Sequence, residues 1–161
     1  MIRFRPLLAA LSAESVQFVI VGGIAAILHG SARVTYDLDI VYNRSPENLQ
    51  RLVAALGPFN PYPRGAPAGL PFTFDFLTLK HGLNFTFDTT AGPIDLLGEL
   101  SGIGSFPAVQ QSAVATDMFG ETYRFLDLDA LIVSKKAAGR KKDVEAVAEL
   151  EMIRDERRSS S

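Results

Sequence analysis

The sequence contains no cysteine among its 161 residues. This absence excludes a disulfide framework and any metal site built from thiolates, and it is consistent with a reducing compartment. The chain also lacks an uncharged apolar run near the roughly 18 residues that a membrane span needs. Because Arg5-Pro6, Glu14 and Gln17 interrupt the apolar N-terminal segment, we expect no export signal, no membrane anchor and a cytoplasmic location.

Histidine and net positive charge are scarce as well. The two histidines, His29 and His81, lie far apart, which leaves little basis for a histidine zinc site or a Ser-His-Asp triad. The formal net charge is −2, so the surface as a whole does not indicate nucleic-acid binding. An anionic partner would therefore have to bind to a local cluster of basic residues. The basic cluster that could do so consists of Lys135, Lys136, Arg140, Lys141 and Lys142.

The remaining composition is that of one folded domain. Hydrophobic residues make up 47% of the chain and charged residues 21%, a balance typical of globular domains. The length suits one core and one site rather than two domains. We therefore predict a single domain over residues 1–156, followed by a frayed tail at 157–161.

Hydrophobic patterning predicts an α+β fold whose mixed, mainly antiparallel sheet is flanked by helices. Five prolines and three glycines make residues 57–71 a loop or flap, whereas 72–80 fits either a strand or a helical turn. The predicted strands cover residues 16–21, 35–42, 83–89, 93–97, 113–116 and 122–126. The predicted helices cover residues 5–15, 24–29, 45–56, 127–138 and 140–154.

A glycine pair, Gly22-Gly23, separates the first predicted strand from the next helix. Without Cβ atoms the backbone can approach a phosphate closely, and the first turn of a helix favours an anion. A glycine pair at the end of a strand is more often a plain tight turn. The motif therefore needs support from elsewhere in the chain before it indicates a phosphate site.

Two carboxylates, Asp37 and Asp39, fall on one face of the predicted strand 35–42, because side chains alternate with a period of two. An isolated Asp-x-Asp pair is most simply a solvated strand face. Here the flanking residues are strongly apolar, which indicates an interior strand. Two like charges on such a strand call for a cation between them, and Mg²⁺ or Mn²⁺ with oxygen ligands is the natural choice.

A third carboxylate, Asp95, lies in the apolar segment 93–97. It could be a hydrogen-bonded core residue. If its strand is next to the strand of Asp37 and Asp39, three carboxylates converge, as a phosphoryl-transfer site with two metal ions requires. Lys135 or Arg140 could then contact the triphosphate, whereas Lys136 and Lys141 are expected on a solvated face.

In this order and spacing, the motifs resemble the minimal nucleotidyltransferases of the polymerase-β superfamily, and most of all AbiEii-type toxins and related bacterial proteins. The resemblance covers most of residues 16–150. It is carried by Val21-Gly22-Gly23-Ile24-Ala25-Ala26, Gly30, Arg33, Thr35, Asp37-Leu38-Asp39, Gly92-Pro93-Ile94-Asp95-Leu96-Leu97, Leu131-Ile132-Val133-Ser134-Lys135 and Gly139-Arg140-Lys141-Lys142-Asp143.

The resemblance implies roles for individual residues. Gly22 and Gly23 would lead into a helix beside the triphosphate. Asp37 and Asp39 would bind two Mg²⁺ or Mn²⁺ ions, and Asp95 would complete the metal site or act as a base. The remaining implied positions are Lys135 at the phosphates, Asp143 beside Lys135 or Arg140, and Arg33 and Thr35 as residues that orient the phosphates or the aspartates.

The implied activity is transfer of a nucleoside monophosphate from a nucleoside triphosphate such as ATP to an acceptor hydroxyl, on a tRNA 3′ end or a protein side chain. A toxin–antitoxin setting would add an antitoxin partner. Ile24 stands where the family frequently has serine, so a degenerate fold that binds nucleotide or a partner protein without turnover is an alternative. A third possibility is the regulatory half of a toxin–antitoxin pair.

Overall fold

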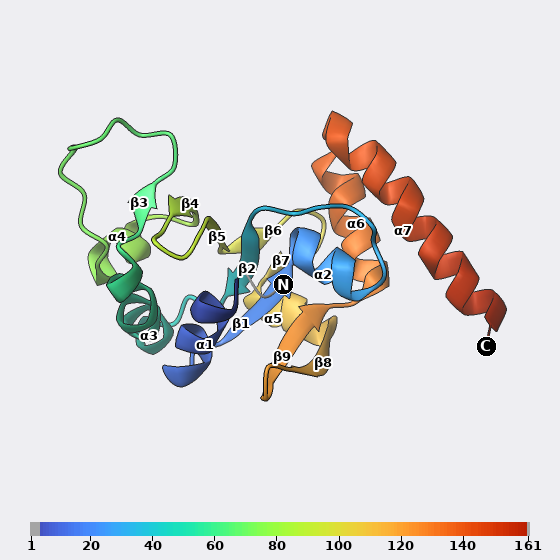
Figure 1. Ribbon diagram of the computed structural model, residues 1–161, viewed down its shortest axis with the longest axis horizontal. Coiled ribbons are helices and arrows are strands. Elements are labelled where there is room, and N and C mark those ends of the chain that lie inside the picture. Colours follow the sequence, from blue (N-terminus) through green and yellow to red (C-terminus); the bar gives the residue numbers. More distant parts are fainter. Residues whose placement is uncertain (1–3, 161) are drawn as a thin grey trace.

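A computed structural model describes residues 4–160 as an α+β fold in which helices flank a mixed sheet. Figure 1 shows the arrangement. The helices are α1 (Arg5–Ala13), α2 (Gly22–Leu28), α3 (Pro46–Leu56), the 3-10 turn η2 (Gly57–Phe59), α4 (Phe76–His81), α5 (Phe106–Gln111), α6 (Leu128–Ala138) and α7 (Lys141–Ser160). The strands are β1 (Phe18–Val21), β2 (Leu38–Tyr42), β3 (Tyr62–Pro63), β4 (Asn84–Asp88), β5 (Ile94–Leu97), β6 (Glu99–Leu100), β7 (Gly104–Ser105), β8 (Ala113–Met118) and β9 (Glu121–Leu126).

Seven strands form the main sheet in the order β3-β4-β5-β2-β1-β9-β8, and β6 and β7 pair separately. Four neighbouring pairs in the main sheet are antiparallel, and two are parallel, namely β1 with β9 and β2 with β5. The prediction of a mixed, mainly antiparallel sheet is confirmed. The β2–β5 pair brings the segment around Asp39 beside the segment around Asp95.

The central strands are held by burial on both faces. All four residues of β1 are buried, and in β2 and β5 the residues Leu38, Ile40, Ile94 and Leu96 are completely inaccessible to solvent. These four alternate with the two strand aspartates, so one face of the β2–β5 pair is apolar while the other carries the carboxylates. Burial of the apolar face therefore fixes the direction in which the carboxylates point.

Several boundaries differ from the sequence-based expectation. Strand β2 begins at Leu38, so Asp37 precedes the strand instead of belonging to it. The ambiguous segment 72–80 contains α4, which Asp75 caps by accepting a hydrogen bond from the Thr78 N–H at 2.9 Å. Strand β3, helix α5 and the β6–β7 pair were not predicted, because such short elements leave little periodicity to detect.

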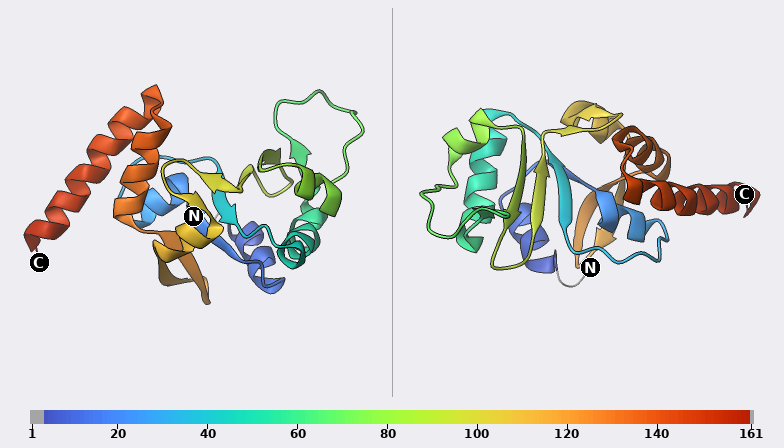
Figure 2. Two further views of the ribbon diagram at one scale, coloured as in Figure 1. Left: turned by 180° about the vertical axis from the view of Figure 1, so that it is seen from behind. Right: turned by 90° about the horizontal axis from the view of Figure 1, so that it is seen from above.

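Helix α7 and the loop between β3 and α4 lie at opposite ends of the molecule (Figures 1 and 2). The helix projects away from the sheet and carries the C-terminus at its far end. It includes residues 157–160, for which the sequence predicts a frayed tail. There the side-chain hydroxyls of Ser159 and Ser160 donate hydrogen bonds to the carbonyls of Asp155 and Glu156, one turn earlier in the helix. In residues 4–160, no helix combines the length and the apolar character needed to cross a membrane.

A buried amide, Asn48, connects α3 to the start of the sheet. Its Oδ1 accepts a hydrogen bond from the Gln17 N–H at 2.7 Å, and its Nδ2 donates to the carbonyls of Gln17 and Asn43 at 3.1 and 2.7 Å. The residue is fully buried.

We therefore expect Asn48→Ala to lower the free energy of unfolding by roughly 2–3 kcal/mol, because it leaves buried backbone groups without partners. Urea unfolding measures this change. Gln50→Ala, at an exposed position of the same helix, is the matched control and should change stability little. Equal effects of the two substitutions would contradict this account of Asn48.

Candidate active site

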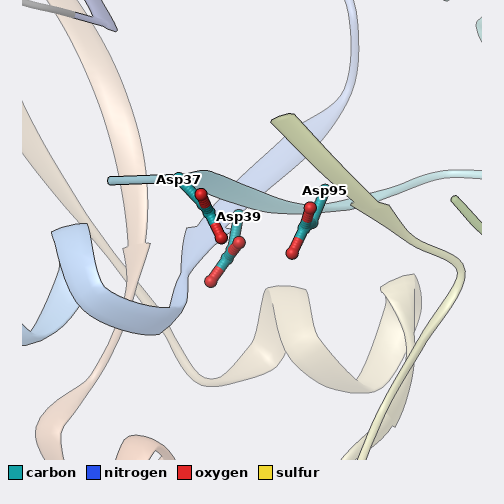
Figure 3. Close-up of side chains that lie close together, drawn as sticks. All are labelled: Asp37, Asp39 and Asp95. Atoms are coloured by element: carbon teal, nitrogen blue, oxygen red, sulfur yellow. The ribbon is translucent and has the colours of Figure 1, made fainter. Parts of the chain in front are cut away.

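Asp37, Asp39 and Asp95 come together at the β2–β5 pair. Asp39 and Asp95 are direct register partners on these parallel strands, and Asp37 lies two residues before Asp39. One oxygen from each carboxylate can be chosen so that all three lie within 4.8 Å of one another. Figure 3 shows the three side chains on the same side of the sheet. The adjacency on which the sequence-based metal site depends is therefore present.

Gly22 makes room for the Asp39 carboxylate. Strands β1 and β2 pair Val21 with Asp39, so the residue after Val21 lies directly against the aspartate side chain. A Cβ atom on Gly22 would lie 2.1 Å from Asp39 Oδ2, and Gly22 has a φ of +65°. Gly23 is similarly close to Thr35, whose Oγ1 would be 2.5 Å from an added Cβ. In this structure, the glycine pair is needed for contacts within the protein itself.

Asp39 has the most perturbed ionisation in the cluster. Burial, followed by the nearby Asp95 and Asp37 carboxylates, raises its pKa from 3.8 to about 8. Lys135 acts in the opposite direction but does not compensate. The folded chain therefore holds a proton on Asp39 near neutral pH unless another cation neutralises the cluster.

The donor atoms fit a divalent metal ion. Asp39 Oδ1 and Asp95 Oδ1 are both buried, and neither accepts a hydrogen bond within the described chain. A buried carboxylate oxygen without a hydrogen bond is costly, and a metal ion would satisfy Asp39 Oδ1, whereas Asp95 Oδ1 already lies 2.9 Å from the Arg64 guanidinium. Three carboxylates supply the hard oxygen ligands that Mg²⁺ or Mn²⁺ prefers.

One functional residue, Arg64, was not found from the sequence. It follows β3, and its guanidinium lies 2.9 Å from Asp95 Oδ1, 3.2 Å from Asp88 Oδ1 and 3.7 Å from Asp37 Oδ2. The contact with Asp95 is an ion pair whose direction does not meet hydrogen-bond geometry. Arg64 belongs to the proline- and glycine-rich segment, where it has no periodic pattern around it. Only the pairing of β3 with β4 reveals its place.

The basic cluster divides into residues near the site and residues away from it. Lys135 has a side chain 18% exposed, and burial lowers its pKa while Asp143 opposes that shift. Arg140 binds Asp143 through Nε at 2.8 Å, and Lys135 Nζ is 3.9 Å from the same carboxylate. Asp143 thus contacts both cations. Lys136 pairs instead with Glu151 at 3.6 Å.

Arg33 and Thr35 lie in the segment that leads to Asp37. Arg33 Nη2 lies 3.1 Å from Glu145 on α7, so its charge is directed to that helix. Thr35 Oγ1 donates to the Asp37 carbonyl at 3.3 Å. In this structure Thr35 forms a hydrogen bond with the backbone of Asp37, whereas Arg33 connects the segment to α7 through an ion pair.

Two clefts adjoin the carboxylates. The first, of about 240 Å³, contains all three aspartates together with Gly23, Arg33, Thr35, Lys135, Arg140 and Lys142. The second, of about 360 Å³, is bordered by Gly22, Asn84, Glu99, Ser101 and Ser134. Asp39, Lys135 and Arg140 border both. The two clefts therefore adjoin at Asp39, Lys135 and Arg140.

Comparison with solved structures identifies the fold. The chain superimposes on a Thermotoga maritima protein, TM1012, provisionally assigned as a nucleotidyltransferase, with a TM-score of 0.59, 15% identity and coverage of 90% of this chain and 88% of that one. For LnuA, a lincosamide antibiotic adenylyltransferase solved with lincomycin bound, the TM-score is 0.61, the identity 13% and the coverage 94% and 96%.

A third similar structure is the antibiotic-resistance factor ANT(2'')-Ia, with a TM-score of 0.57, 17% identity and coverage of 98% of this chain and 90% of that one. No protein-family model and no curated protein sequence matches the chain. The protein therefore has the nucleotidyltransferase fold expected from its motifs. At these identities the similarity establishes the fold and does not establish the substrate.

The raised pKa of Asp39 predicts a pH dependence of stability in metal-free buffer. Because the folded pKa is about 8 and the reference value is 3.8, the stabilisation from protonated Asp39 is complete below about pH 4 and is lost as the pH approaches 8. Asp39→Asn cannot lose a proton. We expect its melting temperature, relative to wild type, to be higher at pH 8 than at pH 5.

Thermal unfolding in chelator at the two pH values measures this difference. Added Mg²⁺ should raise the wild-type melting temperature at pH 8 and leave Asp39→Asn nearly unchanged, because the ion stabilises ionised ligands. If the melting temperatures of the wild type and of Asp39→Asn change by the same amount between pH 5 and pH 8, Asp39 is not the source of the pH dependence.

Proposed function

We propose that this protein is a Mg²⁺- or Mn²⁺-dependent enzyme that transfers a nucleoside monophosphate from a nucleoside triphosphate to an acceptor hydroxyl. One observation carries the proposal: within the nucleotidyltransferase fold, Asp37, Asp39 and Asp95 converge, and Asp39 and Asp95 each present a buried oxygen that accepts no hydrogen bond. This is the arrangement that two-metal phosphoryl transfer requires. Asp37, Asp39 and Asp95 would hold two ions, which polarise phosphate oxygens and offset the charge that develops there.

The first cleft suits the triphosphate, because metal ions held by the three carboxylates must also contact the phosphates. Lys135 borders this cleft and, with Arg140 and Lys142, adds positive charge that the metal ions alone do not provide. In the transfer, the acceptor oxygen forms a bond to the α-phosphorus while the bond from that phosphorus to the bridging oxygen breaks. Pyrophosphate leaves, and the hydroxyl proton passes to a nearby carboxylate, for which we propose Asp95.

The second cleft suits the acceptor. It reaches Asp39 from the side of β4, β5 and the β6–β7 pair, and its border includes the polar side chains of Asn84, Glu99 and Ser101. An acceptor hydroxyl bound there would meet the triphosphate at the shared wall. This division of the two clefts gives each substrate its own entrance.

The acceptor class is the finer part of the proposal. The motif resemblance favours a tRNA 3′ end or a protein side chain, and a toxin–antitoxin setting with an antitoxin partner. LnuA, which is solved with lincomycin bound, adds a small molecule as an alternative, and this chain covers 96% of its length. A gene neighbour that encodes a small winged-helix or helical protein would favour the toxin–antitoxin setting.

We expect incubation with labelled nucleoside triphosphate, Mg²⁺ and cell extract to label an acceptor, and Asp39→Asn to reduce the incorporation by at least about 100-fold because a metal ligand is lost. Fractionation into RNA, protein and small molecules identifies the acceptor. Gln50→Ala is the control for a harmless surface change.

Binding measurements separate an enzyme from a degenerate fold. Tight, metal-dependent nucleotide binding by the wild type without any incorporation would refute the enzyme and favour the alternative. The observation that motivates this alternative is Ile24, whose side chain is fully buried and offers no hydroxyl to a phosphate.

A bulky residue in the second cleft provides a test of its proposed occupant. Ser101 is exposed in the turn between β6 and β7, so Ser101→Trp should obstruct the acceptor without unfolding the chain. We expect nucleotide affinity in calorimetry to stay within about 2-fold of wild type while incorporation falls at least about 10-fold. Loss of nucleotide affinity instead would assign the second cleft to the nucleotide.

A further inference from the structure

Arg64 lies beside the cluster of three carboxylates and pairs with two of them. Its Nη2 and Nη1 atoms lie near Asp95 Oδ1 and Asp37 Oδ2, at 2.9 and 3.7 Å. No ion pair joins Arg64 to Asp39 among the described residues. The guanidinium is thus placed to one side of the cluster, where it faces two of the three ligands.

The formal charge of the cluster changes because of this arginine. When a bound ion keeps all three carboxylates ionised, they carry three negative charges, and a guanidinium stays protonated at any pH at which the protein is folded. Arg64 therefore leaves two negative charges, which one divalent ion neutralises. A second divalent ion would make the nucleotide-free cluster positive and would have to compete with the guanidinium for Asp37 and Asp95.

Arg64 is held in place by groups outside the cluster. Its Nε pairs with Asp88 Oδ1 at 3.2 Å, and its Nη2 donates to the Phe87 carbonyl at 3.0 Å. Its own backbone N–H donates to the Thr86 carbonyl at 2.9 Å, which extends the β3–β4 pairing by one residue. Because strand β4 fixes both the backbone and the side chain, displacement of Arg64 would break several contacts at once.

We propose that Arg64 takes the place of one of the two cations, so that the nucleotide-free protein binds a single divalent ion. That ion would be held mainly by Asp39 Oδ1, with Asp37 or Asp95 as the second ligand. A further ion would enter only with the negative charge of the triphosphate. This inference rests on the metal site in the proposed function, but it concerns the number of ions and not the reaction.

Titration of Mn²⁺ into nucleotide-free protein, with free Mn²⁺ followed by electron paramagnetic resonance, counts the bound ions directly. We expect about one ion per wild-type chain and about two per Arg64→Gln chain, because removal of the guanidinium frees Asp37 and Asp95 for a second ion. Arg64→Met, which keeps an unbranched side chain in place of the aliphatic part of arginine but removes the charge, should also bind two and replaces the Gln variant if that one does not fold.

Two control variants keep the count interpretable. Arg51→Gln removes an exposed arginine of α3 and should leave the count at one. Asp39→Asn should abolish binding of the first ion. Thermal unfolding of every variant in chelator checks that the fold is retained.

The outcomes separate this inference from the proposed function. Two ions on the wild type, or one ion on both charge-removing variants, would overturn the role of Arg64 while the metal site stands. Absence of Mn²⁺ binding from the wild type and from all Arg64 variants would overturn the metal site itself, and with it this inference. An increase from one ion to two on removal of the arginine charge supports the proposal.

Discussion

The burial of the Asp39 carboxylate against a glycine backbone, in register with a second carboxylate, is the constraint on which the rest of the site depends. An aspartate at the centre of a sheet is unfavourable by itself, since it loses water and faces like charge. The structure supports it with strands whose other face is entirely apolar. Substitution of Gly22 would force the carboxylate away, so the glycine turn and the aspartate act as one unit.

Helix α7 is part of the same arrangement, although it projects from the body of the molecule. Glu149 accepts hydrogen bonds from Ser31 Oγ at 2.5 Å and from the Ala32 N–H at 3.0 Å, and Arg33 adds an ion pair to the same helix. These contacts fix the start of the irregular segment that ends at Asp37. The first carboxylate therefore lies at the end of an irregular segment whose start is bonded to the C-terminal helix, whereas the other two carboxylates lie within strands.

This difference explains how far the sequence alone could predict the site. The alternation of apolar and acidic residues identified Asp39 and Asp95, because burial of a strand face is a local pattern that survives in the sequence. The same pattern placed Asp37 inside a strand, which is wrong, since strand β2 begins at Leu38 and the preceding segment is bonded at Ser31 and Ala32 to Glu149, more than a hundred positions away. Arg64 could not be predicted at all, because its position depends on the pairing of a two-residue strand within a loop.

Because Arg64 lies at the edge of the sheet, mutations that alter its charge differ from mutations that alter the core. Mutations in β1, β2 or β5 disturb the core, and selection against unfolded chains removes most of them. The loop that follows β3 and begins with Arg64 lies outside that core, and loops of this kind tolerate insertions and deletions. The charge of the site can therefore drift through changes in a peripheral loop while the aspartates and the folded scaffold stay constant.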